Sequence, residues 1–136
     1  MAVIVGSDKD LKRLVCGNVV MWDFRNVSGP EEVYASLGVR PEQVWDYLTI
    51  VGDAGDDVPG IKRLGEEAAK VILKDYGTLA EAMSHAHATP SKFYSHKYAK
   101  LLREGVDDAR LSAKLVRLRP DAPLGICGIG CLRRKH

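Results

Sequence analysis

Residues 52–65 read GDAGDDVPGIKRLG, and this stretch decides the fold because a loop dense in Gly, Asp and Pro separates two helical patterns. Before it, a helix is expected from Pro41, with apolar residues at helical spacing, namely Val44, Leu48 and Val51. After it, a helix is expected over residues 66–76 and ends at a glycine. The sequence therefore predicts two helices joined by a tight hairpin.

The rest of the chain divides into short strands and helices. Ala2–Val5 is an apolar, β-branched run typical of a buried strand in a parallel sheet, and residues 113–118 alternate apolar and basic residues, which predicts a strand returning to that sheet. The other expected elements are a short helix through 8–15, a strand at 19–22, a helix at 30–38, a helix from 78 to about 83, a polar loop at 84–91 and one or two helices within 92–112. The predicted fold is a mainly helical α/β domain with a small, partly parallel sheet. Such a thin sheet suggests that further strands lie outside the chain.

The composition is that of one globular domain. The chain has 136 residues, 46% of them hydrophobic and 28% charged, so it is long enough for a single core. Three cysteines argue against a disulfide framework and predict a cytoplasmic location. No apolar run approaches the roughly 20 residues that span a bilayer, so no membrane partner is expected.

Charge is unevenly distributed along the chain. Residues 1–60 carry 5 Lys or Arg and 10 Asp or Glu, whereas residues 61–136 carry 15 and 8, which gives net charges of −5 and +7. An acidic half joined to a basic half suggests divalent cations at one end and a polyanion at the other. Chance scatter of surface charge is the alternative that these counts leave open.

Four aspartates are candidate metal ligands. Asp8 and Asp10 follow the first expected strand, where α/β proteins place ligands. Asp53 and Asp56 follow an apolar helix, at a spacing that lets both carboxylates point the same way. Hard cations such as Mg²⁺ or Mn²⁺ prefer these oxygen ligands, and Asp57 is the substitute ligand beside the second pair. The alternative is that these aspartates only cap helices and form turns.

Segment 58–65 is a candidate DNA-binding hairpin. Gly60 and Gly65 can adopt the positive φ angles of a tight turn, and the N–H groups that begin the next helix suit a phosphate. Nearby basic residues add positive charge: Lys62, Arg63, Lys70 and Lys74. Such a hairpin grips the DNA backbone without reading sequence, whereas a plain structural turn is the alternative.

Three segments together resemble the second half of the 5′ nucleases, the family of phage flap endonucleases and of the 5′–3′ exonuclease domains of bacterial DNA polymerase I. They are SDKDLKRLV (7–15), LGVRPEQVWDYLTIVGDAGDDVPGIKRLGEEAAKVILKDYGTL (37–79) and AKLVRLRPDAPL (113–124). The resemblance runs from about Ile4 to Leu124 and implies a bacterial or phage-infected cell. It implies a helix–three-turn–helix (helix-hairpin-helix) motif that holds duplex DNA near the cleavage site.

The resemblance also implies roles for individual residues. It assigns the second divalent metal of the family to Asp8, Asp10, Asp53 and Asp56. It assigns a K⁺ ion to backbone carbonyls of the hairpin, at Val58, Gly60 and Ile61. It assigns DNA contact to Gly60, Lys62, Arg63, Gly65 and Lys70.

Two departures from the family pattern bear on function. The N-terminal half of the family, with its further strands, acidic ligands and strand-threading arch, has no counterpart in the chain, so a separate chain is an expected partner. Arg63 stands where the family carries a further glycine, and Glu67 stands where it commonly carries a phosphate-facing lysine. These changes predict a DNA grip that is weaker, or moved to Lys62, Arg63 and Lys70.

The predicted function is a metal-binding and DNA-binding segment of a 5′–3′ exonuclease or flap endonuclease, with weak or no activity alone. The alternative is a DNA-binding module that has lost the chemistry. The expected divisions are a metal-site segment (1–57), the hairpin segment (58–79), a helical and return-strand segment (80–124) and a basic tail (125–136).

Lesser candidates remain. Cys127, Cys131 and His136 lack a fourth ligand for zinc. His85, His87 and His96 fit a solvated loop better than a phosphate or metal contact.

Overall fold

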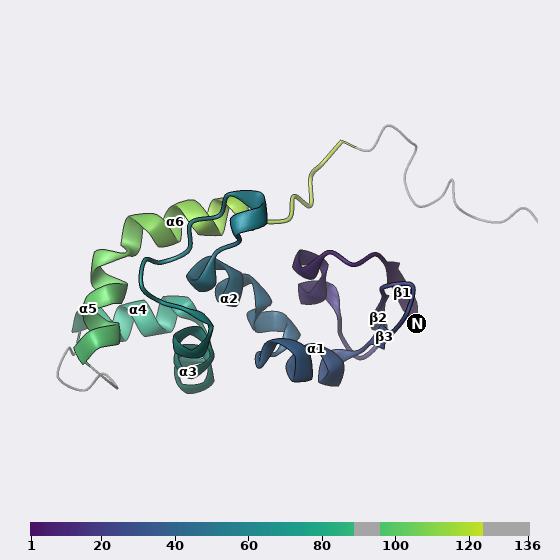
Figure 1. The fold of residues 1–136 in the computed structure, drawn as a ribbon, viewed down its shortest axis with the longest axis horizontal. Coiled ribbons are helices and arrows are strands. Elements are labelled where there is room, and N and C mark those ends of the chain that lie inside the picture. The colour runs from purple at the N-terminus through teal and green to yellow at the C-terminus, as the bar shows by residue number, and fades with distance from the viewer. Residues whose placement is uncertain (89–95, 124–136) are drawn as a thin grey trace, which may run out of the picture.

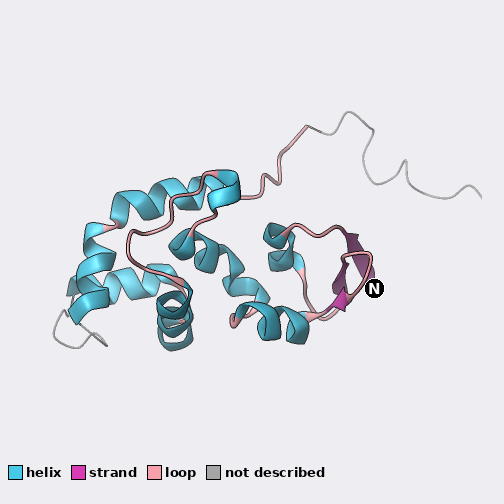
Figure 2. Cartoon of the chain, viewed as in Figure 1, coloured by secondary structure: helices cyan, strands magenta, loops and turns pink. Residues whose placement is uncertain are grey.

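The computed structural model describes residues 1–88 and 96–123, and its two ends differ in character. A small sheet lies near the N-terminus, a group of helices forms the opposite end, and helix α2 (Val44–Val51) runs between them (Figure 1). Helices make up most of the described chain (Figure 2). The prediction of a mainly helical α/β fold with a small sheet is confirmed.

The sheet has three strands in the order β1–β2–β3. β1 (Ala2–Val5) pairs in parallel with β2 (Val19–Trp22), and the crossover between them contains the 3-10 helix η1 (Lys9–Leu14). β3 (Val27–Ser28), which sequence patterns missed, pairs antiparallel with β2. Both predicted N-terminal strands and the partly parallel arrangement are therefore confirmed.

The sheet is far more exposed than its apolar sequence predicts. The exposed fractions are 50% for Val3, 55% for Val5, 40% for Trp22 and 59% for Val27. Among the strand residues, Met21 alone is buried. The expectation of a buried Ala2–Val5 strand is wrong. An apolar strand is buried only where another segment packs on it, and none of the described residues packs over Val3 and Val5.

The helices begin and end largely where glycine and proline predicted. They are α1 (Pro30–Leu37), the 3-10 helix η2 (Pro41–Gln43), α2, α3 (Glu66–Tyr76), α4 (Leu79–Ala88), α5 (His96–Glu104) and α6 (Val106–Leu115), with the 3-10 turn η3 (Ala54–Asp56) inside the hairpin. Gly38 ends α1 and Gly77 ends α3, with φ angles of 73° and 77° that favour glycine. None of the helices in the described ranges is both long and apolar enough to span a membrane.

The core lies among the helices. Its fully buried members include Ile50 of α2, Ile72 and Leu73 of α3, and Leu102 of α5. Gln43 of η2 connects this turn to the C-terminal end of α3, because its side-chain amide donates to the carbonyl oxygens of Leu73 and Gly77. The helical end is therefore well packed, and it carries the hairpin.

Two predictions for the C-terminal part are wrong. Residues 113–118 do not return to the sheet, because α6 continues to Leu115 and buries one face at helical spacing, with Ala109, Ser112 and Val116. A six-residue alternation is too short to exclude this periodicity. Residues 84–88 are helical rather than a loop, since Ala82 and Ala86 of α4 are completely buried one turn apart. The basic tail (125–136), including Cys127, Cys131 and His136, lies outside the described residues.

The connection between α2 and α3, residues 52–65, forms the hairpin and folds back tightly on α2. The Ile61 N–H donates to the Ile50 carbonyl at 2.7 Å, and Asp53 and Val58 exchange two backbone hydrogen bonds of 2.9 and 2.8 Å. At Gly60, where φ is +65°, an added Cβ would lie 2.6 Å from the carbonyl oxygen of Val51. The turn therefore requires glycine at this position for both conformation and space.

Replacing Gly60 with alanine should destabilise the fold by roughly 1–3 kcal/mol, since the side chain meets both a positive φ and backbone atoms of α2. Gly65 gives a matched control in the same hairpin. It caps α3 with φ of −92° and has no atom within 4 Å of an added Cβ. Gly65→Ser should stabilise the fold by roughly a few tenths of a kcal/mol. Urea unfolding measures both, and equal stability of the Gly60→Ala variant and the wild type would contradict the packing argument.

Asp46 of α2 caps a different helix. Its Oδ2 accepts the Leu79 N–H at 3.0 Å at the start of α4, and burial raises the pKa of its carboxyl above the usual range. A raised acid pKa means that the ionised form is disfavoured in the fold, so this group costs stability as pH rises through its unfolded-state pKa towards its folded-state pKa.

Asp46→Asn should therefore be more stable than the wild type at pH 7 and lose that advantage in acid, because an amide oxygen keeps the hydrogen bond without the charge. Asp46→Ala, which removes the acceptor, should cost about 1 kcal/mol at pH 7. Urea unfolding at pH 7 and pH 4 measures this. A less stable Asp46→Asn variant at pH 7 would show that the charge itself holds α4.

Candidate metal centre and nucleic-acid interface

The first aspartate pair is held by η1. Asp8 is the N-cap of η1, and its Oδ1 accepts the Asp10 N–H at 3.0 Å. Asp10 is half-buried, and its pKa is raised first by burial and then by the carboxylates of Asp8, Asp56 and Asp53. The two pairs, far apart in sequence, therefore share one electrostatic environment.

The second pair lies at the start of the hairpin. Asp53 follows α2 and accepts the Gly55 N–H at 3.0 Å, so its carboxylate is fixed as the cap of η3. Its Oδ2 also binds the Lys9 ammonium at 2.6 Å, and this contact lowers the pKa of Asp53. Asp56 contributes to the field at both Asp10 and Lys9. Lys9 therefore links η1 to the hairpin and neutralises one carboxylate.

The two carboxylate pairs are linked through Lys9, and their side chains, as described, are not arranged as a complete set of metal ligands. Within residues 1–88 and 96–123, no three His, Cys, Asp or Glu side chains stand close enough together to hold an ion as they are arranged. Asp57, the substitute ligand, is exposed and lines a cavity of about 590 Å³ with Asp53 and Gly52. The geometry is that of an acidic site whose nearest counter-charge is the Lys9 ammonium.

The hairpin presents two exposed cations. Lys62 and Arg63 are exposed, and Arg63 has a φ of 69°, which is the conformation that glycine adopts most easily. Both residues line a cavity of about 360 Å³ whose other walls include the acids Glu104, Asp107 and Asp108. The positive charge of the hairpin is thus partly offset by acids around the start of α6.

The glycines and carbonyls of the hairpin differ in availability. The Gly60 N–H is buried and donates to the Ser112 Oγ at 3.0 Å, whereas Gly65 is exposed at the start of α3. The Val58 carbonyl already accepts from the Asp53 N–H, and the Ile61 carbonyl accepts from the Leu64 N–H. Each carbonyl oxygen retains a second lone pair for a cation.

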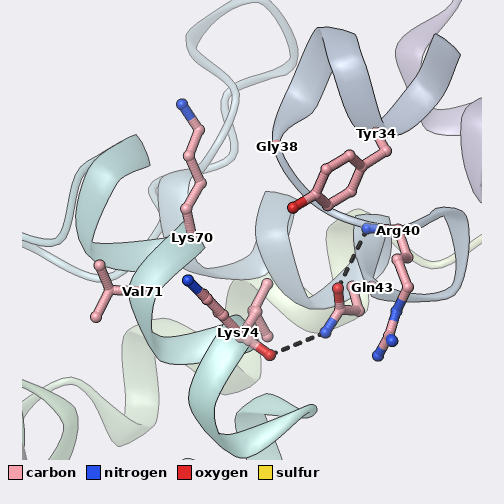
Figure 3. A pocket seen from close by; sticks show the side chains of 8 residues that line it. Tyr34, Gly38, Arg40, Gln43, Lys70, Val71 and Lys74 are labelled. Atoms are coloured by element: carbon pink, nitrogen blue, oxygen red, sulfur yellow. Dashed lines mark hydrogen bonds between the residues drawn. The ribbon is translucent and has the colours of Figure 1, made fainter. Parts of the chain in front are cut away.

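A second basic region lies on α3. Lys70 forms ion pairs with Glu67 at 2.9 Å and with Glu66 at 3.9 Å. The acid at position 67 therefore neutralises the lysine one helical turn further along α3. Lys70 and Lys74 line a cavity of about 330 Å³ between α1 and α3, together with Arg40 (Figure 3). Sequence patterns missed Arg40, because its place before Pro41 marks a helix start and gives no sign of the approach of α3.

The histidine candidates lack a shared site. His85 packs its ring against Tyr76, with 5.2 Å between ring centroids. His87 is exposed on α4 and lines an apolar cavity with Met83 and Val106. The side chain of His96 lies outside the described residues.

Comparisons with known proteins agree on one family. The model of the family described as "5′-3′ exonuclease, C-terminal SAM fold" matches residues 39–130. The flap endonuclease Xni of Shewanella halifaxensis is 38% identical over 127 residues, covering 92% of this chain and 48% of the relative. DNA polymerase I of Rhizobium leguminosarum is 38% identical over 125 residues, covering 90% of this chain and 12% of the relative.

Solved structures show the same fold. The T5 5′-exonuclease, in a structure with bound zinc, superposes with a TM-score of 0.70 at 20% identity, covering 84% of this chain and 42% of that one. The chain spans about half the length of its flap endonuclease relatives. The match over residues 39–130, the similarity to both flap endonucleases and polymerase I, and the shared fold show that the chain belongs to the 5′ nuclease family and carries its C-terminal domain.

Proposed function

We propose that the chain is the metal-binding and DNA-binding part of a structure-specific 5′–3′ exonuclease or flap endonuclease that acts in DNA replication or repair. It binds branched or duplex DNA without sequence preference and supplies one divalent-metal site for phosphodiester hydrolysis. The observation that carries this proposal is the Lys9–Asp53 ion pair of 2.6 Å, which joins η1, with Asp8 and Asp10, to the hairpin, with Asp53 and Asp56. The hairpin that supplies two of these carboxylates also carries the exposed cations Lys62 and Arg63.

The donor set suits a hard divalent ion. Asp8, Asp10, Asp53 and Asp56 offer only oxygen ligands, with Asp57 as a substitute, which is the chemistry that Mg²⁺ and Mn²⁺ prefer. The Lys9 ammonium 2.6 Å from Asp53 takes the place of a cation and has to leave that carboxylate when an ion binds. When bound, the ion would neutralise charge that develops on the phosphodiester. Structures of the T5 enzyme with divalent metal ions support the same dependence here.

The hairpin holds the DNA backbone. Lys62, Arg63 and the open N-terminus of α3 at Gly65 provide the contacts, because exposed cations and free N–H groups both attract phosphate. A K⁺ ion on the carbonyls of Val58, Gly60 and Ile61 would add to this grip. Glu67 weakens DNA binding in two ways: it places a negative charge near the N-terminus of α3, and it pairs with Lys70. A T5 flap endonuclease complex with DNA supports a nucleic-acid partner.

A further polypeptide segment completes the fold. β1 is an edge strand of the sheet, and Val3 and Val5 on it are exposed, as is Trp22 on the neighbouring β2. Since the chain spans 48% of a flap endonuclease relative, the remaining part of the family fold is the natural cover for this sheet. Activity then requires that segment, either from the same polypeptide or from a separate chain.

A non-catalytic DNA-binding module is the second candidate. It is favoured by the absence, in the described ranges, of three potential ligands close enough to hold an ion as they stand. The two functions share DNA binding and differ in metal binding.

Lys62→Glu with Arg63→Glu should weaken the binding of a flap DNA for all sequences alike. The double variant should also lower the slope of log affinity against log salt by about 2, since each lost phosphate contact contributes about 0.9. Fluorescence anisotropy at several salt concentrations measures both quantities. Glu67→Lys should have the opposite effect, because it frees Lys70 and restores a cation to this face.

Arg25→Glu with Lys114→Glu provides the control, with the same change in net charge at exposed positions that line no cavity together with hairpin residues. If this control weakens binding as much as the hairpin variant does, binding depends on net charge alone and the hairpin interface is rejected.

A further inference from the structure

We propose that a groove lined by arginines, between η1, α2 and the segment that follows α6, binds a phosphate of the single-stranded part of the DNA. The groove has a volume of about 760 Å³ and is lined by Arg13, Arg117 and Arg119 together with Leu14, Trp45 and Leu118. None of these residues has a role in the proposed metal site or hairpin. The proposal rests on the proposed function, because it assumes a DNA substrate.

Arg13 is the group that most needs a ligand. Its Nη1 is buried and has no hydrogen-bond partner among the described residues. The guanidinium carbon lies 5.4 Å from the ring centroid of Trp45, and the Trp45 Nε1 donates to the Ala113 carbonyl at 3.3 Å. The side chain is therefore held in place by stacking while a charged N–H group remains unsatisfied, which an acceptor in the groove would correct.

The neighbouring arginines make the groove selective for an anion. Arg117 is exposed and forms no ion pair with any described residue, while Arg119 pairs with Asp121 at 3.3 Å. Within residues 1–88 and 96–123, none of the residues that line the groove is acidic. Guanidinium groups bind phosphate and carboxylate through two parallel hydrogen bonds, so these arginines suit an oxyanion better than a neutral ligand.

The position of the groove favours a nucleic-acid phosphate over a peptide carboxylate. Arg13 follows Asp10 by three residues on η1, which is one 3-10 turn and about 6 Å along the axis. A DNA strand whose scissile phosphate lies at the carboxylates would therefore pass this groove with its next phosphates. Leu14, Trp45 and Leu118 offer an apolar wall for the sugar and base of the same nucleotide.

Trp45 provides a direct readout. In a Trp22→Phe variant, Trp45 is the remaining tryptophan, and a single-stranded oligothymidylate should change its fluorescence with saturation. Arg13→Gln with Arg117→Gln should reduce this affinity at least fivefold and lower the salt slope by about 1.4, since a single-strand phosphate contact contributes about 0.7. Lys100→Gln with Arg103→Gln removes the same charge from α5 and should change neither value.

A second variation changes the DNA and leaves the protein intact. Neutral methylphosphonate linkages in the flap arm next to the junction should weaken binding to the unmodified protein, and the same linkages at the far end of the arm should not. This arm of the experiment stays informative if Arg13→Gln unfolds the protein.

Four outcomes would overturn the proposal. They are a Trp45 signal that does not respond to the oligonucleotide, affinities that do not depend on the position of the methylphosphonates, a response to inorganic phosphate equal to that of the oligonucleotide, and a response to an octaglutamate peptide instead of DNA. Duplex binding through Lys62 and Arg63 is measured separately. Its loss would reject the proposed function, whereas an unresponsive Trp45 with normal duplex binding would reject only the groove.

Discussion

The close contact between the hairpin and the C-terminal end of α2 is the constraint on which the rest of the structure depends. Gly52 and Gly60 let two backbone segments touch, since an added Cβ at Gly52 would lie 2.5 Å from the Val58 carbonyl. This contact turns the chain back at Asp53 and brings its carboxylate to Lys9 of η1. It also leads the chain into α3, so one turn sets both the acidic neighbourhood and the presentation of Lys62 and Arg63.

Charge in this domain is paired locally, which shapes how ligands would bind. Lys9 forms an ion pair with Asp53, so a metal ion has to compete with an ammonium group for that carboxylate. Glu67 forms an ion pair with Lys70, so a DNA phosphate has to compete with a carboxylate for that lysine. Arg13 differs, because stacking on Trp45 holds it without an acceptor. The Lys70 and Glu67 side chains are 31% and 87% exposed, and a pair so accessible to water contributes little to stability, so exchanging it for a DNA phosphate costs little free energy.

The sequence predicted most of the helical framework and little of the detail at the site. Glycine and proline mark helix ends through backbone sterics, so α1, α2 and α3 could be located from Gly38, Pro41 and Gly77. The aspartates drew attention because they follow apolar elements, and the structure shows that Asp8 and Asp53 also cap η1 and η3, as the alternative interpretation predicted. The pairing of Lys9 with Asp53 could not be predicted, since it depends on how η1 packs beside α2.

Other misses have the same origin. The apolar run of β1 predicts that the strand is buried, but composition does not say which segment packs against it. In the structure Val3 and Val5 are exposed. The alternation in residues 113–118 continued a helix because Ser112 and Val116 pack inward, with the Ser112 hydroxyl accepting the Gly60 N–H. Contacts between distant segments decided each case.

The central claim is that the four aspartates form one divalent-metal site, and Mn²⁺ binding to the intact chain, followed by the loss of the free-ion electron paramagnetic resonance signal, tests it most directly. The account predicts one saturable site per chain, abolished by Asp10→Asn with Asp53→Asn and tightened by Lys9→Met, which removes the competing ammonium. Asp75→Asn, an exposed change elsewhere on α3, should leave the titration unaltered. An unmodified chain that binds no Mn²⁺, or a double variant that binds it equally well, would contradict the account.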